Sequence, residues 1–245
     1  MIFKCVKIIA MNTRFLRSKA FFGENGMEKL KNSHVAVFGL GGVGSYAVEA
    51  LCRGGVGKLS LIDSDEYNIT NINRQLYATD STIGKKKVEV AKERAYSINP
   101  DITVETYDKF VLLNDSSVLD FSKFDYVVDA IDTISGKLEI IKQCKNHSVP
   151  VISCMSAGNK LDQTGFKVAD IKETKVCPLC KVMRKLLKEH GIDNLKVVYS
   201  EEKPLCLEES GDLKGNRPAP SSNSFVPPIV GLIAAGEVIK NLTKF

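Results

Sequence analysis

The stretch His34-Val-Ala-Val-Phe-Gly-Leu-Gly-Gly-Val-Gly44 decides the fold of this chain. Its first five residues form a short apolar run that ends at glycines, which is typical of a strand buried on both faces of a parallel sheet. From Ser45 to Arg53 the apolar residues recur with helical spacing, and two glycines end that pattern. The run Lys58 to Ile62 has the composition of a second strand. Together these segments predict a β-α-β unit with a glycine turn after its first strand.

The rest of the chain continues this alternation of strands and helices. We predict helices over 83–98 and 134–146 and strands over 102–107, 125–129 and 150–154. After Cys154 the pattern changes, with apparent antiparallel additions over 158–171 and 195–201, a basic helix over 181–190 and an apolar helix over 227–242. The sequence therefore predicts an α/β protein with a Rossmann-like, mostly parallel sheet, helices on both faces and antiparallel C-terminal additions.

The composition is that of a globular protein. Of the 245 residues, 44% are hydrophobic and 26% are charged, with a formal net charge of +5. No apolar run approaches the ~20 residues needed to span a bilayer, and no signal-peptide cleavage site follows the first ten residues. We therefore expect a soluble, cytoplasmic protein with no membrane partner. The seven cysteines, an odd number, favour reduced thiols over a disulfide framework. Met11 is a candidate alternative start.

The glycine turn carries the first chemical signal. Gly39, Gly41 and Gly44 satisfy G-x-G-x-x-G between a strand and a helix, and Gly42 lies within the same turn. Glycines let the backbone approach phosphates, and the helix N-terminus supplies unpaired N–H groups. Asp63 closes the second strand, where ribose hydroxyls need an acceptor. These features predict a bound nucleotide.

The residues after Asp63 favour a triphosphate over a nicotinamide dinucleotide. Asp65, Asn71 and Arg74 follow directly after the second strand and Lys87 lies on the next predicted helix, and a plain dinucleotide site has no need of them. Asp65 could position Mg²⁺ or the ribose, Asn71 and Arg74 could grip phosphate oxygens, and Lys87 could neutralise departing pyrophosphate. An oxidoreductase and a non-catalytic nucleotide sensor are the less favoured readings.

Taken together, these motifs resemble the adenylation domain of the ubiquitin-activating enzyme superfamily. The matching positions are Gly39 to Gly44, Asp63-x-Asp65, Asn71-x-x-Arg74-Gln75, Gly84-x-x-Lys87 and Asp129-x-x-Asp132. The resemblance implies ATP and Mg²⁺, with Gly41 at the phosphates, Asp63 at the ribose, Asn71, Arg74 and Lys87 along the phosphate chain, and Asp132 near Mg²⁺ and the reacting carboxylate. It also implies a homodimer in which Arg17 enters the partner's site as an arginine finger. Arg17, Arg74, Lys87 and Asp132 are thus the expected catalytic residues.

Within that superfamily the chain is most similar to the tRNA threonylcarbamoyladenosine dehydratase branch. The similarity rests on the segments 14–25, 156–162, 168–171 and 182–187. It implies that tRNA carrying threonylcarbamoyladenosine is the substrate and that the threonyl carboxylate is adenylated before a ring closes with loss of water. The alternative is a branch that adenylates a small sulfur-carrier protein, and a sulfur-transfer protein could also dock. On this view 1–245 is a single adenylating domain, with an N-terminal helical arm over 11–31, a nucleotide-binding core over 32–155 and substrate-side elements over 156–245 that include a mobile loop at 203–225.

The cysteines bear on the choice between these branches. Relatives that activate sulfur carriers usually hold zinc with two C-x-x-C pairs, whereas this chain has only Cys177 and Cys180. Zinc is therefore not expected, although Cys206 and His190 could complete a site. Cys154, at the end of a predicted strand, could be a thioester-forming nucleophile or a buried apolar residue, and the second interpretation is favoured.

Overall fold

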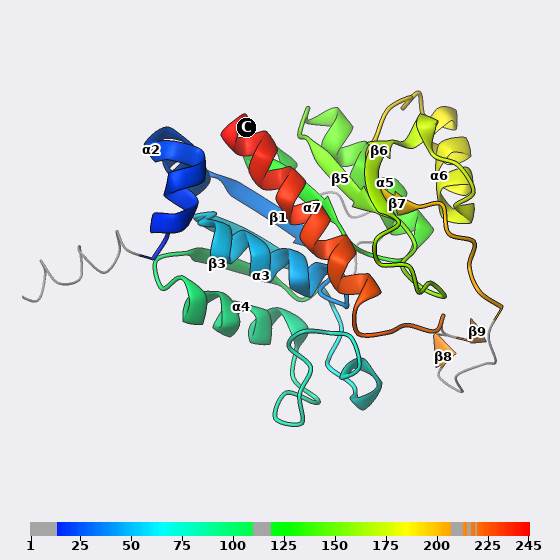
Figure 1. Ribbon diagram of the computed structural model, residues 1–245, viewed down its shortest axis with the longest axis horizontal. Helices are drawn as coiled ribbons and strands as arrows, with labels where there is room; N and C mark the ends of the chain where they lie inside the picture. The colour runs from blue at the N-terminus through cyan, green and yellow to red at the C-terminus, as the bar shows by residue number, and fades with distance from the viewer. Residues whose placement is uncertain (1–13, 110–118, 207–212, 215–216, 219) are drawn as a thin grey trace, which may run out of the picture.

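A seven-stranded sheet forms the centre of the computed structural model, which describes residues 14–109, 119–206, 213–214, 217–218 and 220–245. Its strand order is β3-β2-β1-β4-β5-β7-β6 (Figure 1). The strands are β1 (His34–Phe38), β2 (Lys58–Ile62), β3 (Thr103–Tyr107), β4 (Tyr126–Asp129), β5 (Val151–Cys154), β6 (Phe166–Asp170) and β7 (Lys196–Ser200). The chain order reverses beside β1, which pairs in parallel with β2 on one side and with β4 on the other. Such a switch point is where open α/β sheets bind ligands.

Helices cover both faces of the sheet, as predicted. On one face lie α3 (Gly44–Gly54), α4 (Lys87–Ile98) and α7 (Val226–Thr243), joined at the end of the sheet by α2 (Leu16–Asn32). On the other lie α5 (Ile134–Asn146) and α6 (Pro178–Glu189). Every residue of β1 is buried because Val35 and Val37 pack toward the first group while Ala36 and Phe38 pack toward α5. The continuous apolar run in the sequence follows from this two-sided burial.

The C-terminal strands differ in one respect from the sequence-based expectation. β6 is antiparallel to β7, as predicted, but β7 itself runs parallel to β5 and continues the parallel sheet. The chain enters β7 from α6, so α6 acts as the crossover that restores the parallel direction. One antiparallel strand, β6, therefore forms that edge of the sheet.

Two glycines with positive φ change the course of the helices, one before α4 and one within α2. The sequence predicted a helix from Ile83, whereas α4 begins at Lys87. Gly84 has a φ of 79°, and its N–H donates to the Tyr67 carbonyl, so the chain turns before the helix can start. Within α2, Gly23 adopts a φ of 67° and kinks the helix.

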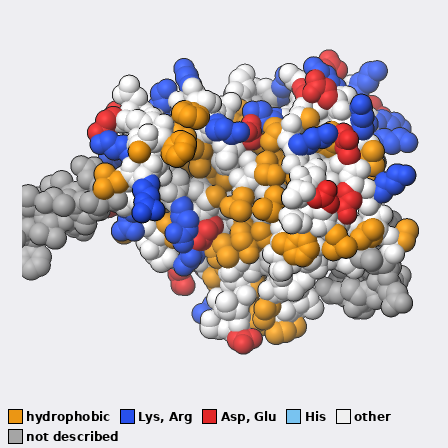
Figure 2. All heavy atoms as spheres, in the orientation of Figure 1, with side chains coloured by type: hydrophobic (Ala, Val, Ile, Leu, Met, Phe, Trp, Pro, Cys, Tyr) orange, Lys and Arg blue, Asp and Glu red, His pale blue; other side chains and the backbone are white. Residues whose placement is uncertain are grey.

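The apolar C-terminal helix packs on the rest of the protein. Among the described residues, α7 alone is long and apolar enough to cross a membrane, with a mean hydropathy of 1.2. It packs against α3 and α2 and lies over β5. Figure 2 shows apolar side chains gathered along the middle of this face, and on α7 Leu232 is 43% exposed. The loop predicted over 203–225 lies partly outside the described residues, and within it β8 (Leu213–Lys214) pairs with β9 (Arg217–Pro218).

Candidate active site

A cleft of about 620 Å³ opens at the carboxyl ends of β1, β2 and β4. Nine of the ten predicted nucleotide-binding residues line it, which are Gly39, Gly41, Gly42, Asp63, Asp65, Asn71, Arg74, Lys87 and Asp132. The tenth, Gly44, starts α3 behind the turn. The fold thus brings together residues from five separate segments of the sequence, as the motifs predicted.

The glycines of the turn have different roles. Gly39 has a φ of 86°, and a Cβ there would lie 2.9 Å from the Ala130 carbonyl oxygen. A Cβ on Gly44 would lie 1.7 Å from the Gly39 carbonyl oxygen, so Gly44 is required for strand and helix to meet. Gly41 is different, because the atom nearest to its hypothetical Cβ is the Gln75 Nε2 at 3.8 Å. The open space at Gly41 faces the cleft and is available to a ligand.

Asp63 fixes the glycine turn against the end of β2. Its Oδ2 accepts the Leu40 N–H at 2.6 Å, and its Oδ1 accepts the Asp65 N–H at 2.8 Å. Burial raises the pKa of the Asp63 carboxyl, although Lys87 and these two N–H groups oppose the shift. The carboxylate therefore holds the turn in place while facing the cleft, where a ribose hydroxyl could donate to it.

Lys87 brings a positive charge to the wall of the cleft. The residue is 5% exposed, and its Nζ lies 2.8 Å from Asp65 Oδ2 and 4.0 Å from Asp63 Oδ1. Its N–H donates to the Asp65 carbonyl oxygen at 3.0 Å, which ties the start of α4 to the end of β2. An ammonium group held in a low-dielectric wall is well suited to interact with a phosphate chain.

The segment from Thr70 to Gln75 contributes another part of the cleft wall. Asn68 and Asn71 form a capping box around the short helix η1 (Ile69–Asn71). The Arg74 Nη1 donates to the Thr70 carbonyl at 2.8 Å, which holds its guanidinium beside the cleft. Gln75 is 7% exposed, and its Oε1 has no hydrogen-bond partner among the described residues. Gln75 belongs to the sequence motif without a predicted role, and its place beside Gly41 in the cleft makes its amide a candidate ligand group.

A buried ion pair supports the turn that carries Asp132. The Lys137 Nζ lies 3.0 Å from Asp129 Oδ2 and donates to the Cys154 carbonyl at 2.7 Å. Ser153 donates to the same Asp129 oxygen at 2.5 Å, and the Ile131 N–H donates to Asp129 Oδ1 at 3.3 Å. Sequence analysis did not single out Lys137. The sequence offered one sign of its burial, because Lys137 occupies an apolar position of the predicted helix 134–146.

Arg17 does not line the cleft of its own subunit. It is exposed on α2, and α2 packs beside the amino ends of the strands, where Gly57 N–H donates to the Leu30 carbonyl. The cleft lies at the opposite edge of the sheet. Participation of Arg17 therefore requires a second subunit, and its role stays a prediction.

Three of the cysteines considered as candidate functional residues, Cys154, Cys177 and Cys180, are buried. Cys154 is 3% exposed, and burial raises its pKa to about 12, which suppresses the thiolate that a nucleophile needs. This agrees with the favoured interpretation of a buried apolar residue. Cys177 and Cys180 are also buried, and within the described ranges no third His, Cys, Asp or Glu joins them as a metal-binding group. The exposed Cys206 and His190 do not complete such a site.

Comparison with protein-family models places this cleft in a known family. The model described as the ThiF family matches residues 14–245. The chain belongs to the ThiF family. This confirms the superfamily resemblance seen in the motifs of the glycine turn and its acidic and basic partners.

Relatives within the ThiF family match almost the whole chain. The tRNA threonylcarbamoyladenosine dehydratase of Bacillus subtilis is 42% identical over 250 residues, covering 94% of this chain and 95% of the relative. The crystal structure of the E. coli tRNA N6-threonylcarbamoyladenosine dehydratase in complex with AMP is 30% identical, with a TM-score of 0.88 and 96% coverage of both chains. The same E. coli protein in complex with ATP gives a TM-score of 0.84 at 31% identity and the same coverage.

A relative named as an adenylyltransferase matches less of the chain. The molybdopterin-synthase adenylyltransferase of Haemophilus influenzae is 36% identical over 130 residues, which is 53% of each protein. The similarity to the dehydratases extends through the substrate-side half of the chain.

Proposed function

We propose that this protein uses ATP to adenylate the threonyl carboxylate of threonylcarbamoyladenosine in tRNA and then closes a ring with loss of water. The similarity to the Bacillus subtilis dehydratase over nearly the full length of both chains carries this proposal. The crystal structures of the E. coli dehydratase with ATP and with AMP support the same nucleotide for this chain. The cleft has two features that suit a nucleotide. Gly41 leaves room for a ligand, and Lys87 brings a buried cation to the wall.

The cleft residues divide the work of binding the nucleotide. The turn at Gly41 receives the phosphates, and Asp63 accepts from the ribose. Arg74 and Lys87 neutralise the phosphate chain, together with the Asn71 amide. These are the groups that stabilise the charge gathering on pyrophosphate as it leaves.

Asp132 is the proposed Mg²⁺ ligand. Its carboxylate is exposed at the cleft, and hard oxygen donors of this kind suit Mg²⁺, which keeps most of its water and binds through one or two carboxylates. Bound Mg²⁺ would supply charge neutralisation at the triphosphate. The buried pair of Asp129 and Lys137 holds the turn that presents Asp132.

The proposed chemistry has two steps that balance. In the first, a carboxylate oxygen bonds to the α-phosphorus of ATP and pyrophosphate leaves. In the second, a neighbouring group of the same modification attacks the activated acyl carbon, loses a proton and displaces AMP. The carboxylate oxygen leaves with AMP, so the product is lighter by one water. Holding both groups of one nucleoside in the cleft makes the second step intramolecular, which lowers the barrier by about 7 kcal/mol or more.

A homodimer completes the proposed site. Arg17 is exposed on α2, and exposed apolar side chains lie near it, with Leu16 51% and Phe21 72% exposed. A second subunit that covers these side chains could place Arg17 beside the phosphates of its partner. We also retain the proposals of a cytoplasmic location and of a possible sulfur-transfer partner.

The alternative substrate is the C-terminal carboxylate of a sulfur-carrier protein. The similarity to molybdopterin-synthase adenylyltransferase supports this alternative, but that similarity covers 53% of each protein. The second C-x-x-C pair is also missing from this sequence. The dehydratase function is therefore favoured.

A single assay distinguishes the two functions. Purified protein is incubated with ATP, Mg²⁺ and tRNA that carries threonylcarbamoyladenosine, and the tRNA is then digested and its nucleosides are weighed. We expect a nucleoside lighter by one water, together with release of AMP. Unchanged tRNA, together with pyrophosphate exchange that depends on a carrier protein, would assign the alternative function.

A further inference from the structure

Two cysteines bracket the first turn of α6 with the spacing found in thiol–disulfide oxidoreductases. Cys177 is the N-cap of α6, Pro178 is its first residue, and Cys180 follows one turn later. Both side chains lie in one buried apolar cluster, and the Cys180 thiol is the largest cause that lowers the pKa of Cys177. The proposed adenylation chemistry makes no use of this pair.

The backbone before the pair is strained. Val176 has a φ of 65°, a conformation that a β-branched residue rarely adopts. The Cys177 N–H donates to the Lys175 carbonyl at 2.6 Å, so Val176 is the centre of a γ-turn. Such strain costs about 1–3 kcal/mol and persists where the surrounding structure enforces it, often at functional sites. Here it directs Cys177 to the N-cap position of α6, at the positive end of the helix dipole.

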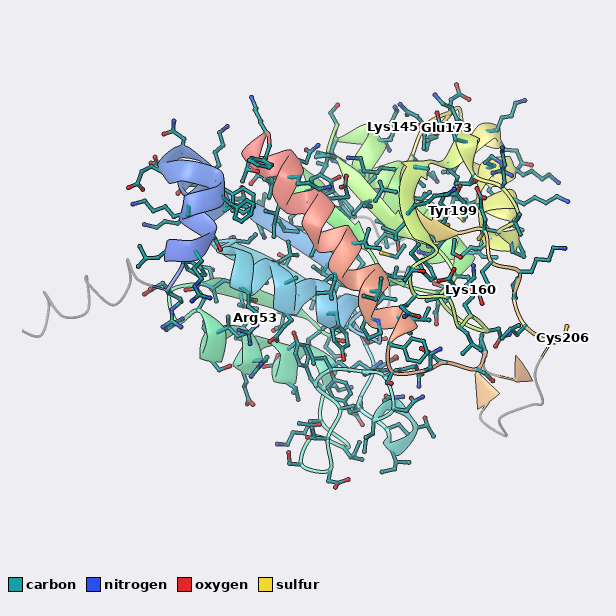
Figure 3. The ribbon with its side chains drawn as sticks, in the orientation of Figure 1. Arg53, Lys145, Lys160, Glu173, Tyr199 and Cys206 are labelled. Carbon is teal, nitrogen blue, oxygen red and sulfur yellow. The ribbon has the colours of Figure 1, made fainter. Side chains whose placement is uncertain are left out.

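A buried lysine accompanies the two sulfurs. Lys160, labelled in Figure 3, is 2% exposed. Its Nζ donates to the Ser200 carbonyl at 3.2 Å and lies 5.5 Å from the centre of the Phe166 ring. Burial lowers the pKa of Lys160, and among the charges that oppose this shift that of Cys177 has the largest effect. The Cys180 thiol, the nearby N–H groups and Lys160 all lower the pKa of Cys177.

This arrangement suits a thiolate and disfavours a metal ion. An ammonium group beside two sulfurs repels a divalent cation, and the described residues offer no third ligand. A dithiol with one acidic and one protonated sulfur is the form that enters thiol–disulfide exchange. Although Cys177 is buried, its neighbours Val176 and Pro178 are both exposed, so the pair lies just beneath the surface.

The pair is also connected to the cleft. Leu179, which lies between the two cysteines, lines the cleft, and so does Met155. Met155 packs with both cysteines in one apolar cluster. The loop that carries Lys160 contributes Gly158 to the same wall.

We propose that Cys177 and Cys180 are a redox-active dithiol that closes to an intramolecular disulfide by exchange with a low-molecular-weight disulfide, and that the cleft senses this state through Leu179. The Cys177 thiolate attacks one sulfur of the small disulfide, and the other sulfur leaves as a thiolate. Cys180 then loses its proton and attacks the Cys177 sulfur, which releases the second small thiol. Two electrons and two protons pass from the protein to the small disulfide, which is reduced to two thiols.

The first test titrates the wild-type protein against glutathione. The full chain is equilibrated at defined ratios of reduced to oxidised glutathione, quenched with acid, unfolded, alkylated and digested. We expect the peptide that carries Cys177 and Cys180 to lose both alkylations together in one transition. Cys206→Ser is the matched control, because this exposed thiol lies outside the pair and its removal should leave the transition unchanged. Alkylation of both thiols at every ratio, or glutathione on one of them only, would overturn the proposal.

The second test measures the thiolate directly. The rate at which Cys177 reacts with iodoacetamide is followed against pH, and we expect its midpoint to fall well below the ~8.5 of a free cysteine. Lys160→Gln should raise this midpoint by about one pH unit, which slows the reaction about tenfold at pH values well below both midpoints. Lys167→Gln removes a surface lysine that pairs with Glu201 and should change nothing. A wild-type midpoint near 8.5 would contradict the role of Lys160.

The third test examines the link to the cleft. ATP affinity is measured by calorimetry on the reduced and the disulfide forms, and we expect the Kd to differ at least severalfold. Equal Kd values, with the disulfide formed, would refute the link through Leu179. Absence of ATP binding in both forms would instead refute the proposed function. The glutathione titration measures disulfide formation and does not depend on whether ATP binds.

Discussion

The Lys137 ammonium and the Asp129 carboxylate form an ion pair in the interior, 3.0 Å apart with side chains 1% and 0% exposed. Because a buried charge without its partner is costly, we expect Lys137→Met to lower the free energy of unfolding by about 3–5 kcal/mol. Asp129→Asn in the Lys137→Met background should cost less than the sum of the single changes. Urea unfolding measures all three. Lys142→Met, which removes a half-exposed pair with Glu139 on the same helix, should cost about 1 kcal/mol at most. Similar losses for Lys137→Met and Lys142→Met would contradict this account.

Substitutions at Gly41 and Gly44 should have different effects, the first on nucleotide binding and the second on folding. Gly41→Ala places its Cβ in open space, so we expect a folded protein whose ATP affinity falls about tenfold, as one lost charge-assisted hydrogen bond would give. Gly44→Ala places its Cβ 1.7 Å from the Gly39 carbonyl oxygen and should cost about 3 kcal/mol of stability. Thermal melting and calorimetry with a non-hydrolysable ATP analogue report the two effects. If Gly41→Ala failed to fold, the proposal that the open space beside Gly41 holds the nucleotide would be contradicted.

Lys87 and Lys86 are neighbours with different expected roles. Lys87 is buried at the cleft, so Lys87→Ala should reduce AMP formation on modified tRNA about 10²–10³-fold. Lys86 pairs with Glu66 at 3.1 Å on the surface, and Lys86→Ala should retain activity within about twofold. Circular dichroism controls for folding. A Lys87→Ala enzyme as active as Lys86→Ala would remove Lys87 from the site.

Arg17 and Asp132 test the dimer by complementation. Each single change, Arg17→Ala or Asp132→Ala, should abolish turnover. After the two inactive variants are mixed and allowed to exchange subunits, half of the dimers are mixed and each contains one intact site. About a quarter of the wild-type activity should therefore return. An active monomer in sedimentation, or no recovery after proven exchange, would contradict the arginine finger.

His34 makes the stability depend on pH. It is 7% exposed, and its Nε2 lies 2.9 Å from the Ser60 hydroxyl. Burial is the main cause that lowers the pKa of His34 below its ordinary 6.5. The unfolded chain therefore binds the proton at a higher pH than the folded protein, and stability is lost as pH falls below about 6.5. We expect His34→Gln to reduce the loss of stability between pH 7.5 and 5.5 in urea unfolding. His190→Gln, at an exposed position, should not reduce it.

Much of the fold follows from local sequence. β1, β2 and α5 lie within the predicted bounds because a strand buried on both faces and an amphipathic helix leave strong local patterns. The start of α4 was predicted too early, because the turn at Gly84 depends on a hydrogen bond to Tyr67, 17 positions back along the chain. The direction of β7 was likewise decided by its pairing with β5.

The sequence alone determined the chemistry of the cleft, because glycines, carboxylates and basic residues at fixed spacing suit few ligands besides a nucleotide triphosphate. Only the tertiary structure decided which glycine leaves room for that ligand and that Gln75 lies beside it. It also revealed the charge of Lys137 under the turn and the electrostatic interaction of Cys177 with Lys160, residues 17 positions apart. These features depend on burial and on distances across the sheet, and neither can be predicted from the local sequence.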